Sequence, residues 1–453
     1  MVSVRYNPHL LGETNKRKRG EKMIRQTVLP FKLKRTEERI TARSGLVLYE
    51  EFMRAMGVEE LMGRYMPRPG SGRGFEAIRY IKGLSMTLYG GGESIEDVRE
   101  IREDDSLREV VGFEEIPSSS AIGDWLKRMG EGGGIVGMER VNDGMGRKVL
   151  RRDDRKGYTL IVDPTVIESE KREAQMSYLG FKGYRPVIAT LKEIGWVIAY
   201  EFREGNDNGG RVEILKKAFS KMPRGKEIEE VLLDAEYYTY EVMDYLEERK
   251  VRWAIAVDKD VSVMEMIRSI SEEEWEPLKT RDGIMTDREV AETVHTMNKG
   301  KIAFRLVVLR WKERQRDLFK DAYNYHCIAT NMVEQSEEEV VWGYNGRAQI
   351  ENHIKEIRVG FGMERLPSGD FLANAVHFGI GIMTYNLFIA QKLLTMPEEW
   401  KTKTIKSLRW LLVEVAGRLI SHGRRMILKI ATSIDKFRIY LEMRRRTYEL
   451  LLE

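Results

Sequence analysis

The sequence predicts an α/β protein: a mixed five-stranded sheet with flanking helices, interrupted by a β-rich insertion and bordered by N- and C-terminal helical regions. Five short apolar runs bounded by turn residues are typical of strands, at 159–162, 185–191, 196–202, 230–234 and 253–257. Helical spacing of apolar residues separates the later runs, at 211–219 and 237–250. Apolar residues also recur at i, i+3 and i+4 from 44 to 128, and again from about 335 onward.

The order of these central elements is strand, strand, strand, helix, strand, helix, strand. A hairpin-rich start followed by two crossover helices indicates a mixed sheet covered by helices. This is the order of the RNase H-like fold, in which the first and fourth strands are neighbours. Residues 259–330 interrupt the pattern with alternating segments, 303–309 and 323–329 among them, which predict the β-rich insertion.

Positive charge gathers at the two ends of the chain. The sequence has 76 Lys and Arg against 72 Asp and Glu, a net charge of +4, yet residues 1–43 hold twelve basic and four acidic residues. This segment has little periodicity and is predicted to be a flexible arm. The stretch 398–453 is also basic. Basic ends around an acidic middle favour a polyanionic partner, although a solubilising tail explains a charge run equally well.

Composition excludes several classes of protein. The single cysteine, Cys327, excludes an intrachain disulfide and any zinc site with two or more thiolates, and it fits a reducing cytosol. No run reaches the roughly 18 apolar residues of a membrane span. The nearest, 378–394, is interrupted by polar residues and predicts a buried helix. The N-terminus lacks the apolar core of a signal peptide, so we expect a cytoplasmic protein with no membrane partner.

Two acids stand at the ends of predicted buried strands. Asp163 ends the first strand of the core and Asp234 ends the fourth. Each alone is typical of a turn or a helix cap. In an RNase H-like sheet, however, the two carboxylates would converge at one edge, where they repel each other unless a cation neutralises them. Mg²⁺ prefers such oxygen ligands.

A third acid lies on a predicted helix. Spacings of three, four, four and three put five residues on one helical face: Tyr344, Arg347, Glu351, Lys355 and Arg358. A solvated ladder of salt bridges is the simpler interpretation of this pattern, because Arg347, Glu351 and Lys355 follow each other at i, i+4.

The acidic trio resembles the catalytic residues of the Asp-Asp-Glu transposases of prokaryotic insertion sequences. The helix resembles their Tyr-x2-Arg-x3-Glu-x6-Lys signature, with Arg358 in the last position. More specifically, the chain resembles insertion-sequence family number 1380 within the wider family-4 group. The segments that carry this resemblance follow one order from about residue 44 to 430: 91–97, 107–108, 116–118, 163–165, 182–186, 203–206, 234, 330–331, 346–356, 366–368 and 385–387.

The resemblance implies a DNA transposase with Asp163, Asp234 and Glu351 as catalytic residues that hold Mg²⁺, for which Mn²⁺ can substitute. Such a protein binds the terminal inverted repeats of its insertion sequence, cleaves the DNA ends by phosphodiester hydrolysis and transfers the 3′ ends to target DNA. We expect it to act as a homodimer on double-stranded DNA at the nucleoid. The expected DNA contacts are Tyr344, Arg347, Lys355, Arg358, Lys16, Arg17, Lys18 and Arg19.

The same resemblance gives each region of the chain a role. In order, these are a basic flexible arm (1–43), a helical DNA-binding domain (44–150), the first part of the RNase H-like catalytic core (151–258), the β-rich insertion (259–330), the second part of the core with the glutamate helix (331–395) and a basic C-terminal helical region (396–453). Two positions depart from the family pattern. Ile161 stands where members often have an acid, and Leu232 stands where they often have an arginine that contacts phosphate.

Three alternatives remain open from the sequence. The first is a transposase-derived DNA-binding protein without catalysis, and the second is an RNase H-like metal-dependent nuclease without strand transfer. The third is a helical scaffold whose acids are all caps. Convergence of Asp163, Asp234 and Glu351 is the observation that separates the third alternative from the others.

Overall fold

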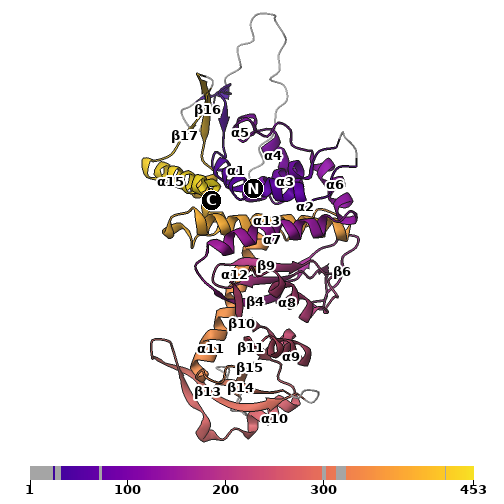
Figure 1. The fold of residues 1–453 in the computed structure, drawn as a ribbon, viewed down its shortest axis with the longest axis vertical. Coiled ribbons are helices and arrows are strands. Elements are labelled where there is room, and N and C mark those ends of the chain that lie inside the picture. The colour runs from indigo at the N-terminus through magenta and orange to yellow at the C-terminus, as the bar shows by residue number, and fades with distance from the viewer. Residues whose placement is uncertain are drawn as a thin grey trace, which may run out of the picture.

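A computed structural model of the chain describes residues 24–25, 32–70, 74–297, 302–312, 323–423 and 425–452. The predicted DNA contacts Lys16, Arg17, Lys18 and Arg19 lie outside these residues and stay a prediction. Figure 1 shows an elongated molecule, with the helical layers toward one end and the sheet with its insertion toward the other.

A mixed sheet of nine strands organises the described chain, in the order β12-β13-β14-β15-β11-β10-β4-β8-β9. The five predicted strands form one side of it: β9 (Trp196–Glu201), β8 (Val187–Leu191), β4 (Gly157–Pro164), β10 (Glu227–Leu233) and β11 (Arg252–Val257). β10 pairs in parallel with β4 and β11, whereas β4–β8 and β8–β9 are antiparallel. The first and fourth predicted strands are therefore neighbours, as the sequence predicted.

The mixed α/β class with flanking helices is confirmed, but the sheet has nine strands and not the five predicted for it. Strands from residues 259–330 extend the same sheet: β15 (Tyr323–Thr330) pairs antiparallel with β11, followed outward by β14 (Ala303–Lys312), β13 (Met285–Thr296) and β12 (Glu276–Lys279). The physical reason lies in the outer edge of β11. Its backbone N–H and C=O groups need partners, and β15 supplies them.

Helices pack against the sheet and against one another in layers. α7 (Gly134–Arg152) and α13 (Phe371–Leu394) contact β9 and separate the sheet from the other N-terminal helices (Figure 1). Those are α1 (Leu46–Ala55), α2 (Val58–Tyr65), α3 (Ala77–Tyr89), α4 (Val98–Arg102), α5 (Asp105–Val110) and α6 (Ser119–Glu131). The remaining helices beside the sheet are α8 (Arg211–Ser220), α9 (Tyr240–Glu248), α10 (Val261–Ser269), α11 (Glu337–Asn345) and α12 (Gln349–Lys355).

Helix α13 is the central helix of the core. Within the described residues it is the one helix long and apolar enough to span a membrane, yet 94% of its most apolar stretch is buried inside the protein. It contacts α3, α6, α7 and β9. This agrees with the buried helix predicted for 378–394.

The C-terminal region is not wholly helical, contrary to the prediction. A hairpin of β16 (Gly417–His422) and β17 (Arg425–Ile430) lies between α14 (Ile405–Leu408) and α15 (Ile434–Leu452), and β16 also pairs with β3 (Ile40–Thr41). Burial alternates at the start of β16, which is the period of a half-buried strand rather than of a helix. A short pair, β1 (Ile24–Arg25) and β2 (Lys32–Leu33), lies within the predicted arm.

Candidate active site

The two aspartates lie at the carboxyl ends of neighbouring strands, at the same edge of the sheet. β4 and β10 run parallel, with Val162 opposite Leu233. Asp163 and Asp234 come directly after these two residues, so they stand side by side where the carboxyl ends of the strands meet. The pair that the strand order predicted is therefore brought together.

Both carboxyl groups are in surroundings that disfavour a negative charge. Burial, with the charge of Asp234 as the second cause, raises the pKa of Asp163 from 3.8 to about 7. Burial and then the charge of Glu236 raise the pKa of Asp234. Oδ1 of Asp234 is buried and has no hydrogen-bond partner among the residues that the structure describes. An unpaired buried carboxylate oxygen is costly unless a proton or a cation meets it, so the pair has the chemistry of a cation site.

Arg347 lies against this pair. Its Nη1 donates a hydrogen bond to Oδ1 of Asp163 at 3.3 Å, and the two side chains are 20% and 18% exposed. Its positive charge lowers the pKa of both aspartates and so opposes the effect of burial. Arg347 thereby places a permanently charged cation directly beside the acidic pair.

Tyr344 is directed into the protein instead of toward the cavity. Its hydroxyl donates to the backbone carbonyl of Leu233 at 2.9 Å, one residue before Asp234, and the side chain is 5% exposed. Burial raises the pKa of this hydroxyl to about 12. This hydrogen bond ties α11 to β10, and the predicted contact of Tyr344 with DNA stays a prediction.

Glu351 lines the same cavity as Asp163. This cavity has a volume of about 340 Å³ and is lined by Asp163, Thr165, Glu351, Ile354, Lys355, Arg358, Val359 and Glu364. Nη1 of Arg358 donates to Oγ1 of Thr165 at 3.3 Å, two residues beyond Asp163. Nε of Arg358 is buried and has no hydrogen-bond partner within the described part of the chain. Four of the five predicted helical side chains thus gather around Asp163.

The third acid is close to the pair but does not complete it. Among the residues that the structure describes, no three His, Cys, Asp or Glu side chains form a metal-ligand group. The charge of Glu351 nevertheless raises the pKa of Asp163. Three carboxylates repel one another, which favours the observed arrangement, in which Glu351 stands apart and Arg347 contacts Asp163.

The glutamate helix is irregular, whereas the spacing predicted a regular helical face. α11 ends at Asn345, a 3₁₀ turn follows at Gly346–Ala348, and α12 continues into a π-helical turn at Glu356–Gly360. Oε1 of Glu356 accepts a hydrogen bond from the backbone N–H of Ile405 at 2.6 Å. The tight turn and the wide turn redirect the side chains on either side of Glu351, and π-helical turns are frequent at functional sites.

Sequence reasoning gave no role to Arg185 and Glu236. Arg185 is 4% exposed, is hydrogen-bonded to Glu236 and donates to Oδ1 of Asn208 at 2.6 Å. Glu236 lies two residues beyond Asp234 and affects its pKa. Arg185 falls within a segment that carried the family resemblance, 182–186, but no spacing connects it with the acids, because β8 and the turn after β10 are distant in the sequence.

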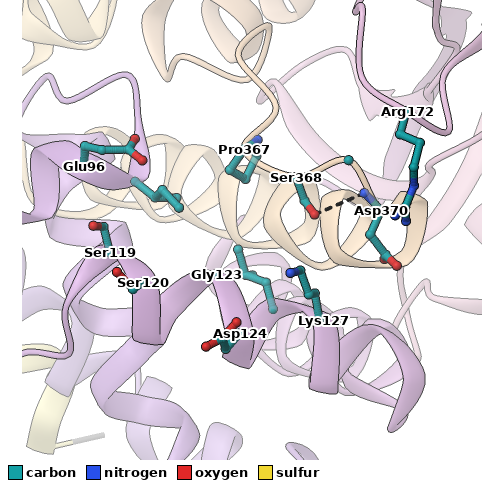
Figure 2. Close-up of a pocket in the computed structure, with 13 residues that line it drawn as sticks. Glu96, Ser119, Ser120, Gly123, Asp124, Lys127, Arg172, Pro367, Ser368 and Asp370 are labelled. Carbon is teal, nitrogen blue, oxygen red and sulfur yellow. Dashed lines mark hydrogen bonds between the residues drawn. The ribbon is translucent and has the colours of Figure 1, made fainter.

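A larger hollow lies apart from the acidic pair. It has a volume of about 530 Å³ and separates α6 from the loop 367–370 that leads into α13 (Figure 2). Its charged residues are two cations and three acids, Lys127, Arg172, Glu96, Asp124 and Asp370. This balance does not favour a polyanion, and Asp370 already caps α13 by accepting from the N–H of Ala373 at 2.8 Å.

The raised pKa of Asp163 predicts a pH dependence of stability in the metal-free protein. An acid whose pKa is higher in the folded state binds its proton more tightly there, so its contribution to stability is greatest at low pH and is lost as pH rises from about 4 to about 7. Thermal unfolding in EDTA should therefore show a smaller gain from Asp163→Asn at pH 5 than at pH 8. An equal gain at both values would contradict the raised pKa.

Comparison with known proteins identifies the class to which this fold and site belong. The family described as Transposase DDE domain group 1 matches residues 27–449, so the chain belongs to this family of DDE transposases. Its function therefore lies in DNA processing related to transposition. A cryo-EM structure of the piggyBac transposase synaptic complex with hairpin DNA is similar at 12% identity and a TM-score of 0.46, over 81% of this chain and 79% of that chain. No curated protein sequence matches the chain.

Proposed function

We propose that this protein is the DNA transposase of an insertion sequence similar to family number 1380, with an RNase H-like catalytic core. It binds the terminal inverted repeats of its element, hydrolyses phosphodiester bonds at the DNA ends and joins the freed 3′ ends to target DNA. The observation that carries the proposal is the pair Asp163 and Asp234 at the carboxyl ends of neighbouring parallel strands. One buried oxygen of Asp234 has no hydrogen-bond partner among the described residues.

The acids supply the ligands for a divalent cation. Asp163 and Asp234 would hold it, and Glu351 would join them from the same cavity. When bound, Mg²⁺ or Mn²⁺ lowers the pKa of the attacking hydroxyl or water and stabilises the oxygen that leaves. The fit rests on the donor set, because hard oxygen ligands suit Mg²⁺ and the raised pKa values of both aspartates would fall beside a cation.

The cations of the site supply the contacts to the DNA phosphate. Arg347 beside Asp163, and Arg358 with Lys355 in the cavity, would bind its non-bridging oxygens and orient it toward the acids. Tyr344 keeps the helix at the correct distance from β10 through its bond to Leu233. Positioning and electrostatic stabilisation are the main contributions a protein makes to such a reaction.

The partners and the location follow from this chemistry. Two element ends must be cut together, so we propose that a homodimer assembles on double-stranded DNA, at the nucleoid in the cytoplasm. The basic arm and the basic C-terminal region would add phosphate contacts, and binding should weaken as salt rises.

The experiment that tests the proposal uses DNA that carries this gene with its native flanks. Purified protein is incubated with the DNA and Mg²⁺, beside an EDTA sample and the Glu351→Gln variant, and the 3′ ends are mapped at nucleotide resolution. We expect discrete breaks at both flanks that are absent from both controls, because each control removes part of the cation site.

Two outcomes would overturn this proposal in favour of its rivals. Salt-sensitive binding without any cut would identify a DNA-binding descendant of a transposase. Scattered cuts without preference for the flanks would identify a simple nuclease.

A further inference from the structure

A small flap rises from the strand that carries Asp163. We use this name for residues 165–186, which connect β4 to β8 and contain β5 (Ile167–Glu168), β6 (Gln175–Met176) and β7 (Lys182–Tyr184). These strands form a separate antiparallel sheet in the order β5-β7-β6. The flap begins at Thr165, whose side chain contacts Arg358 in the cavity, and β6 lies at the margin of the molecule (Figure 1). The base of the flap thus lies at the rim of the candidate active site.

The tip of the flap exposes three large apolar side chains. Met176 is 53% exposed, Tyr178 is 69% exposed and Leu179 is 52% exposed. Between them, the backbone N–H and the hydroxyl of Ser177 both donate to the carbonyl of Phe181 at 2.8 Å. Gly180 has a φ of +85°, which suits glycine. The turn is therefore held by hydrogen bonds of its own, and it presents these side chains to the surface instead of burying them.

The flap tip is connected to the acidic pair through one buried arginine. The guanidinium carbon of Arg185 lies over the ring of Tyr178, 5.3 Å from its centroid. Arg185 in turn is hydrogen-bonded to Glu236, close behind Asp234. One face of the Tyr178 ring is therefore covered by a cation, and the high exposure of the side chain leaves the opposite face open. An aromatic ring fixed in this way is a stacking platform with one free side.

We propose that Tyr178, supported by Met176 and Leu179, stacks on the exposed base at the DNA end that lies in the active site. This inference rests on the proposed function and adds a contact to it. Inside a duplex both faces of each base pair are covered by neighbours, whereas a cut end leaves the last base with one bare face. Such a face is what an open aromatic ring binds, in a manner that tolerates sequence.

The place of the tip near the acidic pair favours DNA as its partner. The exposed charges of the flap are of both signs, Lys171, Arg172 and Lys182 with Glu168 and Glu170, and Arg172 pairs with Glu173 at 2.7 Å. Lys171 and Lys182 would meet the phosphates beside the stacked base. Arg185 links the Tyr178 ring to Glu236, two residues beyond Asp234, so a strand held by the acids would have its end near the flap tip. Stacking would hold the cut end in place between cleavage and joining.

The test uses DNA duplexes that end where the element is cut. In separate duplexes, the fluorescent base 2-aminopurine replaces the last base, the second-last base or the third-last base. Stacking on Tyr178 should quench its fluorescence at the terminal position, and Tyr178→Ala should abolish the quench and weaken binding of the cut end about tenfold. Tyr178→Phe keeps the ring and should behave like the wild type. Ile284→Ala is the control, because Ile284 is a large apolar side chain, 66% exposed in the turn between β12 and β13 and away from the flap.

The outcomes separate the flap from the proposed function. If the wild type cuts at both flanks and Tyr178→Ala binds cut ends with the same affinity and quench, the flap proposal is wrong while the transposase stands. If Tyr178→Phe loses as much affinity and quench as Tyr178→Ala, the hydroxyl and not the ring makes the contact, and this result also overturns stacking. If the wild type makes no end-specific cuts, the proposed function fails first.

Discussion

Asp163→Asn is expected to slow DNA cleavage by about 10³-fold or more while making the metal-free protein more stable. Asparagine keeps the shape of the side chain but loses the charge that holds a cation. The same change removes a carboxyl group whose pKa is raised to about 7 by burial and by Asp234. Each pKa unit of such a shift is worth about 1.4 kcal/mol, so relief of the repulsion should raise the unfolding free energy by at least about 1 kcal/mol at pH 8. Loss of activity with gain of stability is typical of a residue kept for function.

Single-turnover cleavage and thermal unfolding in EDTA measure the two effects on the same preparation. Asp282→Asn is the matched control, since Asp282 is exposed in the turn between β12 and β13. This variant should change neither the cleavage rate nor the stability. A variant that loses both cleavage and stability would show that Asp163 is structural. A variant that cuts at the wild-type rate would exclude Asp163 from the chemistry.

The positions of the two aspartates could be predicted because a strand that is buried on both faces of a sheet leaves a simple pattern in the sequence. β4 and β10 are parallel strands inside the sheet, so they appear as short continuous apolar runs with a sharp polar end. The order of strands and helices then made them neighbours. The residues that end such strands, Asp163 and Asp234, are placed by the sheet itself and need no detail of side-chain packing.

The orientation of the Tyr344 side chain could not be predicted in the same way. The spacing from Tyr344 to Arg358 assumes a regular helix, but a 3₁₀ turn and a π-helical turn interrupt it. Spacing also does not say which side of a helix faces the core, and Tyr344 lies inward on Leu233. The nine-stranded sheet escaped prediction for a related reason: the pairing of β15 with β11 is a contact between segments about 70 residues apart.

Asn386→Leu should have the largest effect on stability. Asn386 lies fully buried on α13, where its Oδ1 accepts from the N–H of Val197 at 3.0 Å and its Nδ2 donates to the carbonyl of Val197 at 3.0 Å and to Asn142 at 3.2 Å. Val197 is in β9, the edge strand of the sheet, so the amide of Asn386 takes the place of a neighbouring strand. Leucine has a similar size but leaves these groups unpaired. At about 1–3 kcal/mol for each, the loss should reach about 3 kcal/mol or more.

Urea unfolding of the full chain measures this loss, with Asn352→Leu as the control. Asn352 is exposed on α12, so its replacement should stay within about 0.5 kcal/mol of the wild type. β9 pairs with β8, and β8 pairs with β4, the strand that carries Asp163. The substitution therefore weakens the edge of the catalytic sheet but removes no contact of the acids themselves. Asn386→Leu should therefore cut at the wild-type rate at low temperature and lose activity only as its lower melting temperature is approached. Slow cleavage in the fully folded variant would instead mean that α13 positions the active site directly.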